Sequence, residues 1–234
     1  VTYGFLACEA DELIEMARRL ISKGHTRLKM LVGSKAGIVE DAKRVCKVRE
    51  AIGEDILLAV DANESLSAEN AMRLCPMIQE YNIAWFEDPI RRVDARDLGM
   101  MRSRTTIPFS AGQMDGHVLR FREWVEHDAI DIFMPNSMYN GGMTETRRVA
   151  ALAQAYNKPL SDAGGGGIYC LHHVAGFRNG TLAEIHLGSE QVEEQMFVDA
   201  PKAKDGRVAI PNAPGFGVTL DRDRLKETLV QKYL

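Results

Sequence analysis

The sequence predicts an α/β protein whose parallel strands close into a barrel. Short apolar runs recur at a spacing of about 25 residues, and segments with helical periodicity lie between them. Three successive runs also lead into side chains that carry oxygen, namely Asp61, Glu87 and Gln113. Strands that alternate with helices pair in parallel, and eight such units without a long interruption favour a closed barrel over an open sheet.

Local signals support each element in turn. The first helix has Leu13, Met16 and Leu20 at helical spacing, and glycines follow the first two helices as stops. Ser67 is a typical N-cap for the third helix. The expected strands are residues 1–7, 27–32, 56–60, 83–86, 107–110, 130–134, 159–161 and 181–187. The expected helices are residues 9–23, 39–52, 67–81, 94–102, 116–126, 143–156 and 168–178.

An open, doubly wound sheet is the alternative fold. Such a sheet usually carries a Gly-x-Gly-x-x-Gly phosphate-binding turn after its first strand, and this chain has none there. The glycine run at 164–167 comes too late in the chain for that role, so a flexible loop is expected. Residues 1–234 are expected to form one barrel domain. Its tail, from about residue 190, is expected to be irregular and to end in a short helix near 221–230.

Composition excludes several classes of partner. The chain has 234 residues, 45% of them hydrophobic, and a net charge of -4 with scattered Lys and Arg, which argues against a nucleic acid or an anionic membrane as partner. No apolar run reaches the roughly 18 residues of a membrane helix. The four cysteines form no C-x-x-C pair, which is typical of reduced thiols in a cytoplasmic protein.

Polar side chains follow the strands at the end where a barrel of this type carries its chemistry. Oxygen ligands from neighbouring strands, with open positions for substrate and water, suit Mg²⁺, and no Cys/His spacing favours zinc there. Asp61, Glu87 and Gln113 are therefore the predicted metal ligands. The complete set after the different strands is Lys29, Asp61, Glu87, Gln113, Asn136, Asp162 and Glu184.

Other candidates have simpler structural interpretations. Asn63 is a candidate substrate contact, although asparagine at this point is more often a turn residue. His172 and His173 could contact an anionic substrate, although a histidine pair at the start of a helix is more often structural. The remaining histidines, at positions 25, 117, 127 and 186, are given no functional role.

Several motifs together resemble the barrel domain of the enolase superfamily, in its mandelate racemase/muconate lactonizing enzyme-like branch. They are Leu28-Lys29-Met30-Leu31-Val32-Gly33, Val60-Asp61-Ala62-Asn63, Phe86-Glu87-Asp88-Pro89, Asp131-Ile132-Phe133-Met134-Pro135-Asn136, Gly141-Gly142-Met143-Thr144-Glu145 and the tail from Ile210 to Val218. The resemblance covers essentially the whole chain. It implies a (β/α)₇β barrel of the TIM type, with an N-terminal α+β capping domain missing from this chain. The tail would pack back toward that capping domain.

The resemblance also implies the chemistry and its residues. The family removes a proton α to a carboxylate, and Mg²⁺ stabilises the enediolate that forms. Asp61 and Glu87 match the first two metal ligands, Lys29 matches a lysine that polarises the substrate carboxylate, and Glu184 matches an acidic residue near the enolate. Oligomers are common in the family, so a homo-oligomer is expected.

The chain departs from the family pattern at four positions. The third metal ligand is usually Glu and here is Gln113. The usual catalytic lysine falls on Leu31, and the usual Asp-His pair falls on Asn136 and Ala163. Another base is then required, and the candidates are Asp162 and His172, followed by Tyr139 and Tyr169, or a residue of the missing capping domain. Tyr139 and Tyr169 are also candidate substrate contacts.

Three functions remain open at this point. The leading hypothesis is a Mg²⁺-dependent dehydratase that converts an aldonic or aldaric acid to a 2-keto acid, with racemase or cycloisomerase chemistry as its variant. The second is a catalytically silent relative that binds a small carboxylate. The third is a Schiff-base aldolase that uses Lys29, although the oxygen ligands on neighbouring strands argue against it.

Overall fold

The strands form a parallel sheet, as the alternation of elements predicts. The computed structural model describes residues 2–4, 9–165 and 167–227, and within them seven strands pair in the order β6-β5-β4-β3-β2-β1-β7. Every pair is parallel. The strands are β1 (Thr2–Gly4), β2 (Arg27–Leu31), β3 (Leu57–Asp61), β4 (Ile83–Glu87), β5 (Phe109–Ala111), β6 (Ile132–Phe133) and β7 (Glu184–His186).

The sheet closes into a ring through one residue. Leu160 pairs in parallel with Phe133 of β6 on one side and with Gly180, upstream of β7, on the other. The Ser161 amide donates to the Phe133 carbonyl at 2.8 Å, and the Asp162 amide donates to the Leu182 carbonyl at 2.9 Å. The expected strand at 159–161 is therefore present only as this bridge.

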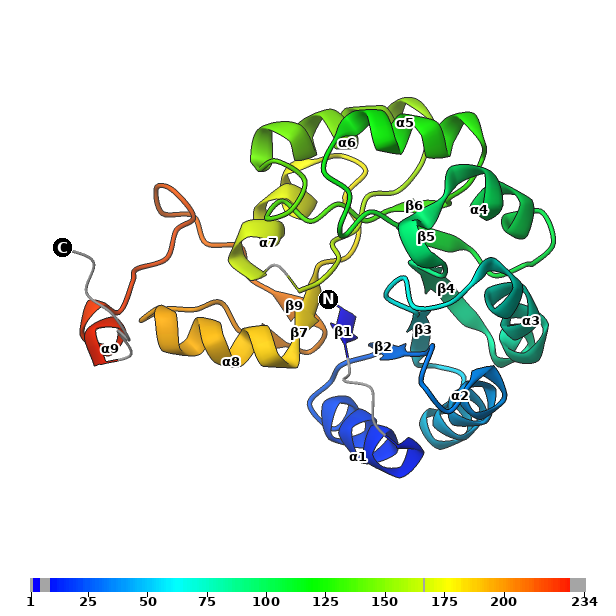
Figure 1. The fold of residues 1–234 in the computed structure, drawn as a ribbon. Coiled ribbons are helices and arrows are strands. Elements are labelled where there is room, and N and C mark those ends of the chain that lie inside the picture. Colours follow the sequence, from blue (N-terminus) through cyan, green and yellow to red (C-terminus); the bar gives the residue numbers. More distant parts are fainter. Residues whose placement is uncertain (1, 5–8, 166, 228–234) are drawn as a thin grey trace.

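Helices cover the outside of the ring, and Figure 1 shows α1 to α6 arranged around the strands. Ser67 caps α3, as predicted, because its side chain accepts from the Asn70 amide. The helices up to β7 are α1 (Ala10–Ile21), α2 (Ile38–Ile52), α3 (Ala68–Ile78), α4 (Ala95–Arg102), α5 (Val118–Glu126), α6 (Met143–Ala155) and α7 (Gly167–Gly176), and the 3-10 turns are η1 (Gln79–Tyr81) and η2 (Arg91–Val93).

Alternation along the strands divides the core in two. Val60 and Phe86 face outward into the large cluster that the helices cover. Ala59 and Trp85 face inward and meet Met134 and Ala163 in a small separate cluster inside the ring. Because side chains in a strand alternate between two faces, Asp61 lies on the inward face with Ala59, and Glu87 with Trp85.

The tail is more ordered than the sequence predicted. Helix α8 (Leu187–Met196) follows β7 directly, then come the antiparallel pair β8 (Ala203–Lys204) and β9 (Arg207–Val208), and then α9 (Arg222–Glu227). The expected strand at 181–187 thus ends one residue early, because His186 caps α8 by accepting from the Gly188 amide at 3.2 Å. Phe197 packs with Ile168 and Leu171, so the tail lies against α7.

Some predictions fall partly outside the described residues. These are positions 1 and 5–7 of the first strand, residue 166 of the glycine run, and residues 228–230 of the final helix. Among the described residues, no helix is both long and apolar enough to span a membrane. Three cysteines, Cys46, Cys75 and Cys170, are free thiols in the described part of the chain.

Candidate functional site

Lys29 is the centre of the candidate site. Its Nζ atom lies 3.1 Å from Asp61 Oδ2, 2.8 Å from Glu87 Oε2 and 3.0 Å from Glu184 Oε2. Strand pairing explains the convergence, because Asp61 lies opposite Glu87 in neighbouring strands, while β1 separates β2 from β7. All four side chains are buried. Side chains from four strands thus meet inside the barrel.

Charge within this group is unbalanced. Burial alone lowers the pKa of Lys29, but the carboxylates of Asp61, Glu184 and Glu87 overcome that effect and raise the pKa well above its ordinary value. The ammonium is therefore held in its charged form. Three acidic side chains share this one ammonium in a buried site, so they can carry more negative charge than Lys29 balances, and a divalent cation would neutralise that excess.

Glu87 is the most deeply buried of the carboxylates. Its Oε2 atom accepts from Trp85 Nε1 at 3.2 Å and from Lys29. Its Oε1 atom has no hydrogen-bond partner among the described residues. Burial raises the pKa of Glu87, and the neighbouring carboxylates of Asp61 and Glu184 add to the rise against the opposing charge of Lys29. A buried carboxylate oxygen without a partner is the feature that a bound cation would explain.

Gln113 reaches the site from the loop after β5. Its side chain packs on Gly164, which has φ +71° and a backbone that approaches the amide closely. A Cβ atom at Gly164 would lie 2.6 Å from Gln113 Nε2 and 3.0 Å from Asn136 Nδ2. The Gly164 amide also donates to Glu184 Oε2 at 2.9 Å. The glycine run predicted as a flexible loop thus supports two residues of the site.

One cavity is lined by Lys29, Asp61, Gln113 and Glu184, whereas Glu87 is not among its described lining residues. Its volume is about 230 Å³, and it contains five of the predicted site residues together with residues that the sequence analysis did not single out. The lining residues are Lys29, Met30, Leu31, Asp61, Asn63, Gln113, Gly164, Glu184, His186 and Ser189. Asn63 is held there by its backbone amide, which donates to Asp61 Oδ1 at 2.7 Å.

The positions that the resemblance assigns to the catalytic bases are apolar or neutral. Leu31 lines the cavity, and Ala163 is buried in the cluster inside the ring. Asn136 is buried, and its Nδ2 atom donates to the Ala163 carbonyl at 2.9 Å. Asn136 is not among the described lining residues, but its side chain lies beside Gly164, which does line the cavity.

The four candidate bases do not line this cavity in the described structure. Asp162 precedes the inward-facing Ala163, and its carboxylate faces α7, as strand alternation requires. Tyr139 is exposed in the loop after β6. Tyr169 contacts the ring of Phe216, and His172 Nε2 lies 3.0 Å from the Phe216 carbonyl oxygen. The described lining of the cavity therefore does not include Asp162, Tyr139, Tyr169 or His172.

His186 and Ser189 line the cavity although neither was predicted. His186 was given no functional role, yet it lies two residues after Glu184 in β7 and so projects from the same face of the strand. The spacing of two residues from Glu184 could therefore have identified His186 from the sequence. Ser189 lies in the first turn of α8, a helix that the sequence analysis did not predict, so no signal pointed to it.

The donor set fits a hard divalent cation. Asp61 and Glu87 offer anionic oxygens within 3.1 Å of the same nitrogen, and Gln113 offers an amide oxygen from the next loop. Oxygen-only ligands of this kind suit Mg²⁺ better than zinc. A closed α/β barrel with an acidic, oxygen-lined cavity at the ends of its strands is the class of protein that the fold and site define.

Comparison with known proteins identifies the family. The family model described as enolase C-terminal domain-like matches residues 12–224, and the chain belongs to this family, in the mandelate racemase/muconate lactonizing enzyme branch of the enolase superfamily. The arabinonate dehydratase of Saccharolobus solfataricus is 28% identical over 226 residues, which are 94% of this chain and 60% of that protein.

Solved structures agree with this assignment. The 3,6-anhydro-D-galactonate cycloisomerase of Zobellia galactanivorans has a TM-score of 0.88 and 29% identity, over 98% of this chain and 65% of the other. The L-talarate dehydratase of Polaromonas sp. JS666, complexed with Mg and L-glucarate, has a TM-score of 0.86 and 26% identity, over 96% and 62%. The chain therefore spans less than two thirds of the length of these relatives.

Proposed function

We propose that the protein is a Mg²⁺-dependent dehydratase of an acid sugar. It removes the proton α to the carboxylate of an aldonic or aldaric acid, expels the β-hydroxyl as water, and yields the enol of a 2-keto acid. The observation that carries the proposal is the cluster of Lys29 with Asp61, Glu87 and Glu184 beside a cavity sized for a small carboxylate. Relatives named as dehydratases of arabinonate and L-talarate support it.

Asp61, Glu87 and Gln113 would hold the metal. Bound Mg²⁺ supplies positive charge where the substrate carboxylate gains negative charge as the proton leaves. Gln113 contributes a neutral oxygen in place of the usual carboxylate, so we expect weaker Mg²⁺ binding than in a site with three acidic ligands. The unpartnered Oε1 atom of Glu87 supports the assignment of that residue.

Lys29 would bind the substrate carboxylate. Its ammonium stays charged because three carboxylates surround it, and so it can donate hydrogen bonds to the oxygens that become more negative. The same charge argues against a Schiff-base aldolase, because a nucleophilic lysine needs a lowered pKa. Glu184 lies on the other side of the ammonium and would orient it toward the cavity.

His186 is our candidate for the acid that protonates the leaving hydroxyl. Its Nδ1 atom accepts from the Gly188 amide, which leaves the proton of the neutral ring on Nε2. A ring with its proton on Nε2 can donate a hydrogen bond to the leaving hydroxyl, and it would transfer a proton to that hydroxyl from its imidazolium form. The sequence candidates Asp162, His172, Tyr139 and Tyr169 do not share this cavity, so we propose that the base comes from a part of the protein outside the described residues.

Turnover of an acid-sugar library tests this function. The full-length protein is incubated with aldonic and aldaric acids and Mg²⁺, and 2-keto acids are detected as semicarbazones. We expect product from at least one acid, and a loss of turnover of at least a hundredfold in Asp61→Asn. His186→Asn should lose elimination yet retain Mg²⁺ binding. No product from any acid, with Mg²⁺ bound, would remove the dehydratase proposal.

Racemase or cycloisomerase chemistry is the nearest alternative, and the likeness to a cycloisomerase favours it. These reactions also begin with removal of the α-proton. Deuterium incorporation at the α-carbon in D₂O, without formation of a keto acid, would distinguish them from dehydration.

A catalytically silent carboxylate binder is the second candidate function. The apolar side chains of Leu31 and Ala163 at the usual base positions favour it. A binder would be stabilised by an acid sugar and would leave it unchanged. Thermal unfolding with and without each acid, followed by recovery of the ligand, separates the binder from the enzyme.

The remaining expectations concern the whole protein. We propose that residues 1–234 fold as one barrel domain, that the protein is cytoplasmic, and that it forms a homo-oligomer that acts on a small carboxylate. Size-exclusion chromatography with light scattering tests the oligomeric state.

A further inference from the structure

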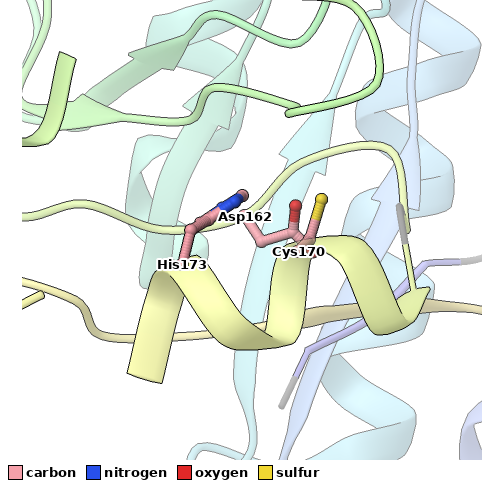
Figure 2. A group of neighbouring side chains, drawn as sticks. All are labelled: Asp162, Cys170 and His173. Carbon is pink, nitrogen blue, oxygen red and sulfur yellow. The ribbon is translucent and has the colours of Figure 1, made fainter. Parts of the chain in front are cut away.

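A second cluster of metal-ligating side chains lies behind the cavity. Asp162 follows the Leu160 bridge, and Cys170 and His173 lie three residues apart on α7. Figure 2 shows both α7 side chains projecting toward Asp162. One ligand atom from each residue lies within 4.8 Å of the others. All three side chains are buried, with 2%, 0% and 1% of their surface exposed, respectively.

Hydrogen bonding within this cluster is incomplete. Neither ring nitrogen of His173 has a hydrogen-bond partner among the described residues, and neither does Asp162 Oδ1. A buried polar atom without a partner costs about 1–3 kcal/mol, so native proteins rarely retain three in one place. A bound ion would account for Asp162 Oδ1 and for one ring nitrogen of His173.

The local geometry leaves the unpartnered atoms available. Asp162 Oδ2 accepts from the Glu184 amide at 3.3 Å, which fixes the carboxylate and leaves Oδ1 free. Residues three apart on a helix share one face, so the thiol and the imidazole point the same way. Ser137 Oγ lies 3.7 Å from Cys170 Sγ, and Asn136 Oδ1, which accepts from the thiol, lies 3.8 Å from it, so either oxygen is a candidate for a fourth position.

The ligand types of these three side chains indicate which metal would bind. A thiol, an imidazole and a carboxylate are ligands of zinc, whereas Mg²⁺ takes oxygen ligands only. Binding would release the thiol proton of Cys170 to solvent, and Zn²⁺ would then balance one thiolate and one carboxylate. The buried site would carry no net charge, which is the condition under which buried ions are tolerated.

We propose that Asp162, Cys170 and His173 form a structural Zn²⁺ site distinct from the oxygen-lined cavity. The ion fastens α7 to the segment that closes the ring. Because Asp162 also holds the Glu184 amide, the site supports a wall of the cavity. This site does not depend on the proposed dehydratase function.

Metal content of the full chain tests the proposal. The protein is expressed with added ZnSO₄, dialysed against buffer that contains Mg²⁺ and no zinc, and analysed by mass spectrometry of the metals. We expect about one Zn²⁺ per chain, with at least a tenfold weaker affinity in Cys170→Ser and His173→Gln. Cys75→Ser, which changes another buried thiol, and Asp61→Asn, in the cavity, should retain zinc.

Cobalt substitution gives a readout that does not depend on variants folding. Co²⁺ added to the zinc-free parent protein should produce a thiolate charge-transfer band in the near ultraviolet, together with the visible bands of a tetrahedral ion. Absence of the charge-transfer band in the folded parent protein overturns the site. Loss of zinc from Asp61→Asn with retention in Cys170→Ser also overturns it.

Discussion

At the scale of single residues, Lys29 holds like charges together. Three carboxylates share its ammonium in a buried site, so its removal leaves them facing one another. We expect Lys29→Met to lower the free energy of unfolding by about 3–5 kcal/mol. Lys43→Met, which breaks an exposed pair with Glu40, should change it by about 0.5 kcal/mol or less. Urea denaturation of the metal-free proteins measures both, and equal effects would contradict the charge argument.

Gln113 sets the charge of the predicted metal site. Gln113→Glu would add a third carboxylate ligand, and we expect Mg²⁺ to bind more tightly, on the order of tenfold. Titration calorimetry measures the dissociation constant. Asp115→Asn, which alters a carboxylate two residues away that pairs with Arg120, is the control and should leave Mg²⁺ affinity unchanged. An unchanged affinity in Gln113→Glu would mean that this side chain is not a ligand.

Gly164 is needed for space as well as for backbone conformation. Alanine at Gly164 would press on Gln113, whereas Gly53 has nearly the same φ, +76°, and nothing near its missing Cβ. Both alanine variants should lose about 1–3 kcal/mol of stability from the positive φ at these positions. Only Gly164→Ala should also weaken Mg²⁺ binding, by titration calorimetry. A matching loss in Gly53→Ala would show that stability alone is responsible.

At the scale of elements, a carboxylate ties α4 to the sheet. Asp131 accepts from Arg102 at 2.7 Å and from the Phe109 amide of β5 at 2.9 Å. Burial raises the pKa of Asp131, but Arg102 and the Phe109 amide outweigh it and lower the pKa below 3.8. A carboxyl group with a depressed folded-state pKa stabilises the protein above its unfolded pKa, and this contribution disappears as the pH falls through the folded value.

Asp131→Asn should therefore be pH-dependent. We expect it to lower the free energy of unfolding by about 1–3 kcal/mol at neutral pH, and by progressively less as the pH falls below 3.8. Denaturant unfolding at a series of pH values measures the difference from the parent protein. Asp128→Asn, at a mostly exposed partner of Arg102, should have a smaller effect at every pH. A difference that does not vary with pH would argue against the ion pair.

The sequence predicted helices and strands well where apolar residues recur with a regular period. It predicted them less well where contacts between distant segments determine the structure. Strands β2 to β4 and the helices beside them have apolar periods that are visible in the sequence, and the structure agrees within a few residues. Helix α8 was missed because its start depends on the capping side chain of His186. The structure brings Asp61, Glu87 and Lys29 together, as the convergence of strand ends predicts. Tyr169 and His172 could not be positioned, because their place depends on contact with Phe216 in the distant tail.

At the scale of the whole molecule, metal binding should be coupled to folding. The carboxylates that repel each other in the metal-free protein attract a cation only when the barrel brings them together. Free Mg²⁺ at 100 times its dissociation constant should therefore raise the free energy of unfolding by about 2.7 kcal/mol. Thermal unfolding at several Mg²⁺ concentrations measures this increase. Asp61→Asn should lose most of the response, and an equal response in that variant would relocate the ion.

The strands of the ring differ in length around its circumference. Five-residue strands carry Lys29, Asp61 and Glu87, whereas a single bridging residue, Leu160, joins the part next to Asn136 and Ala163. The seam at Leu160 is the thinnest wall of the barrel. Substitutions beside such a seam would leave the part of the barrel that carries Lys29, Asp61 and Glu87 undisturbed. New reactions could therefore arise there without rebuilding the rest of the molecule.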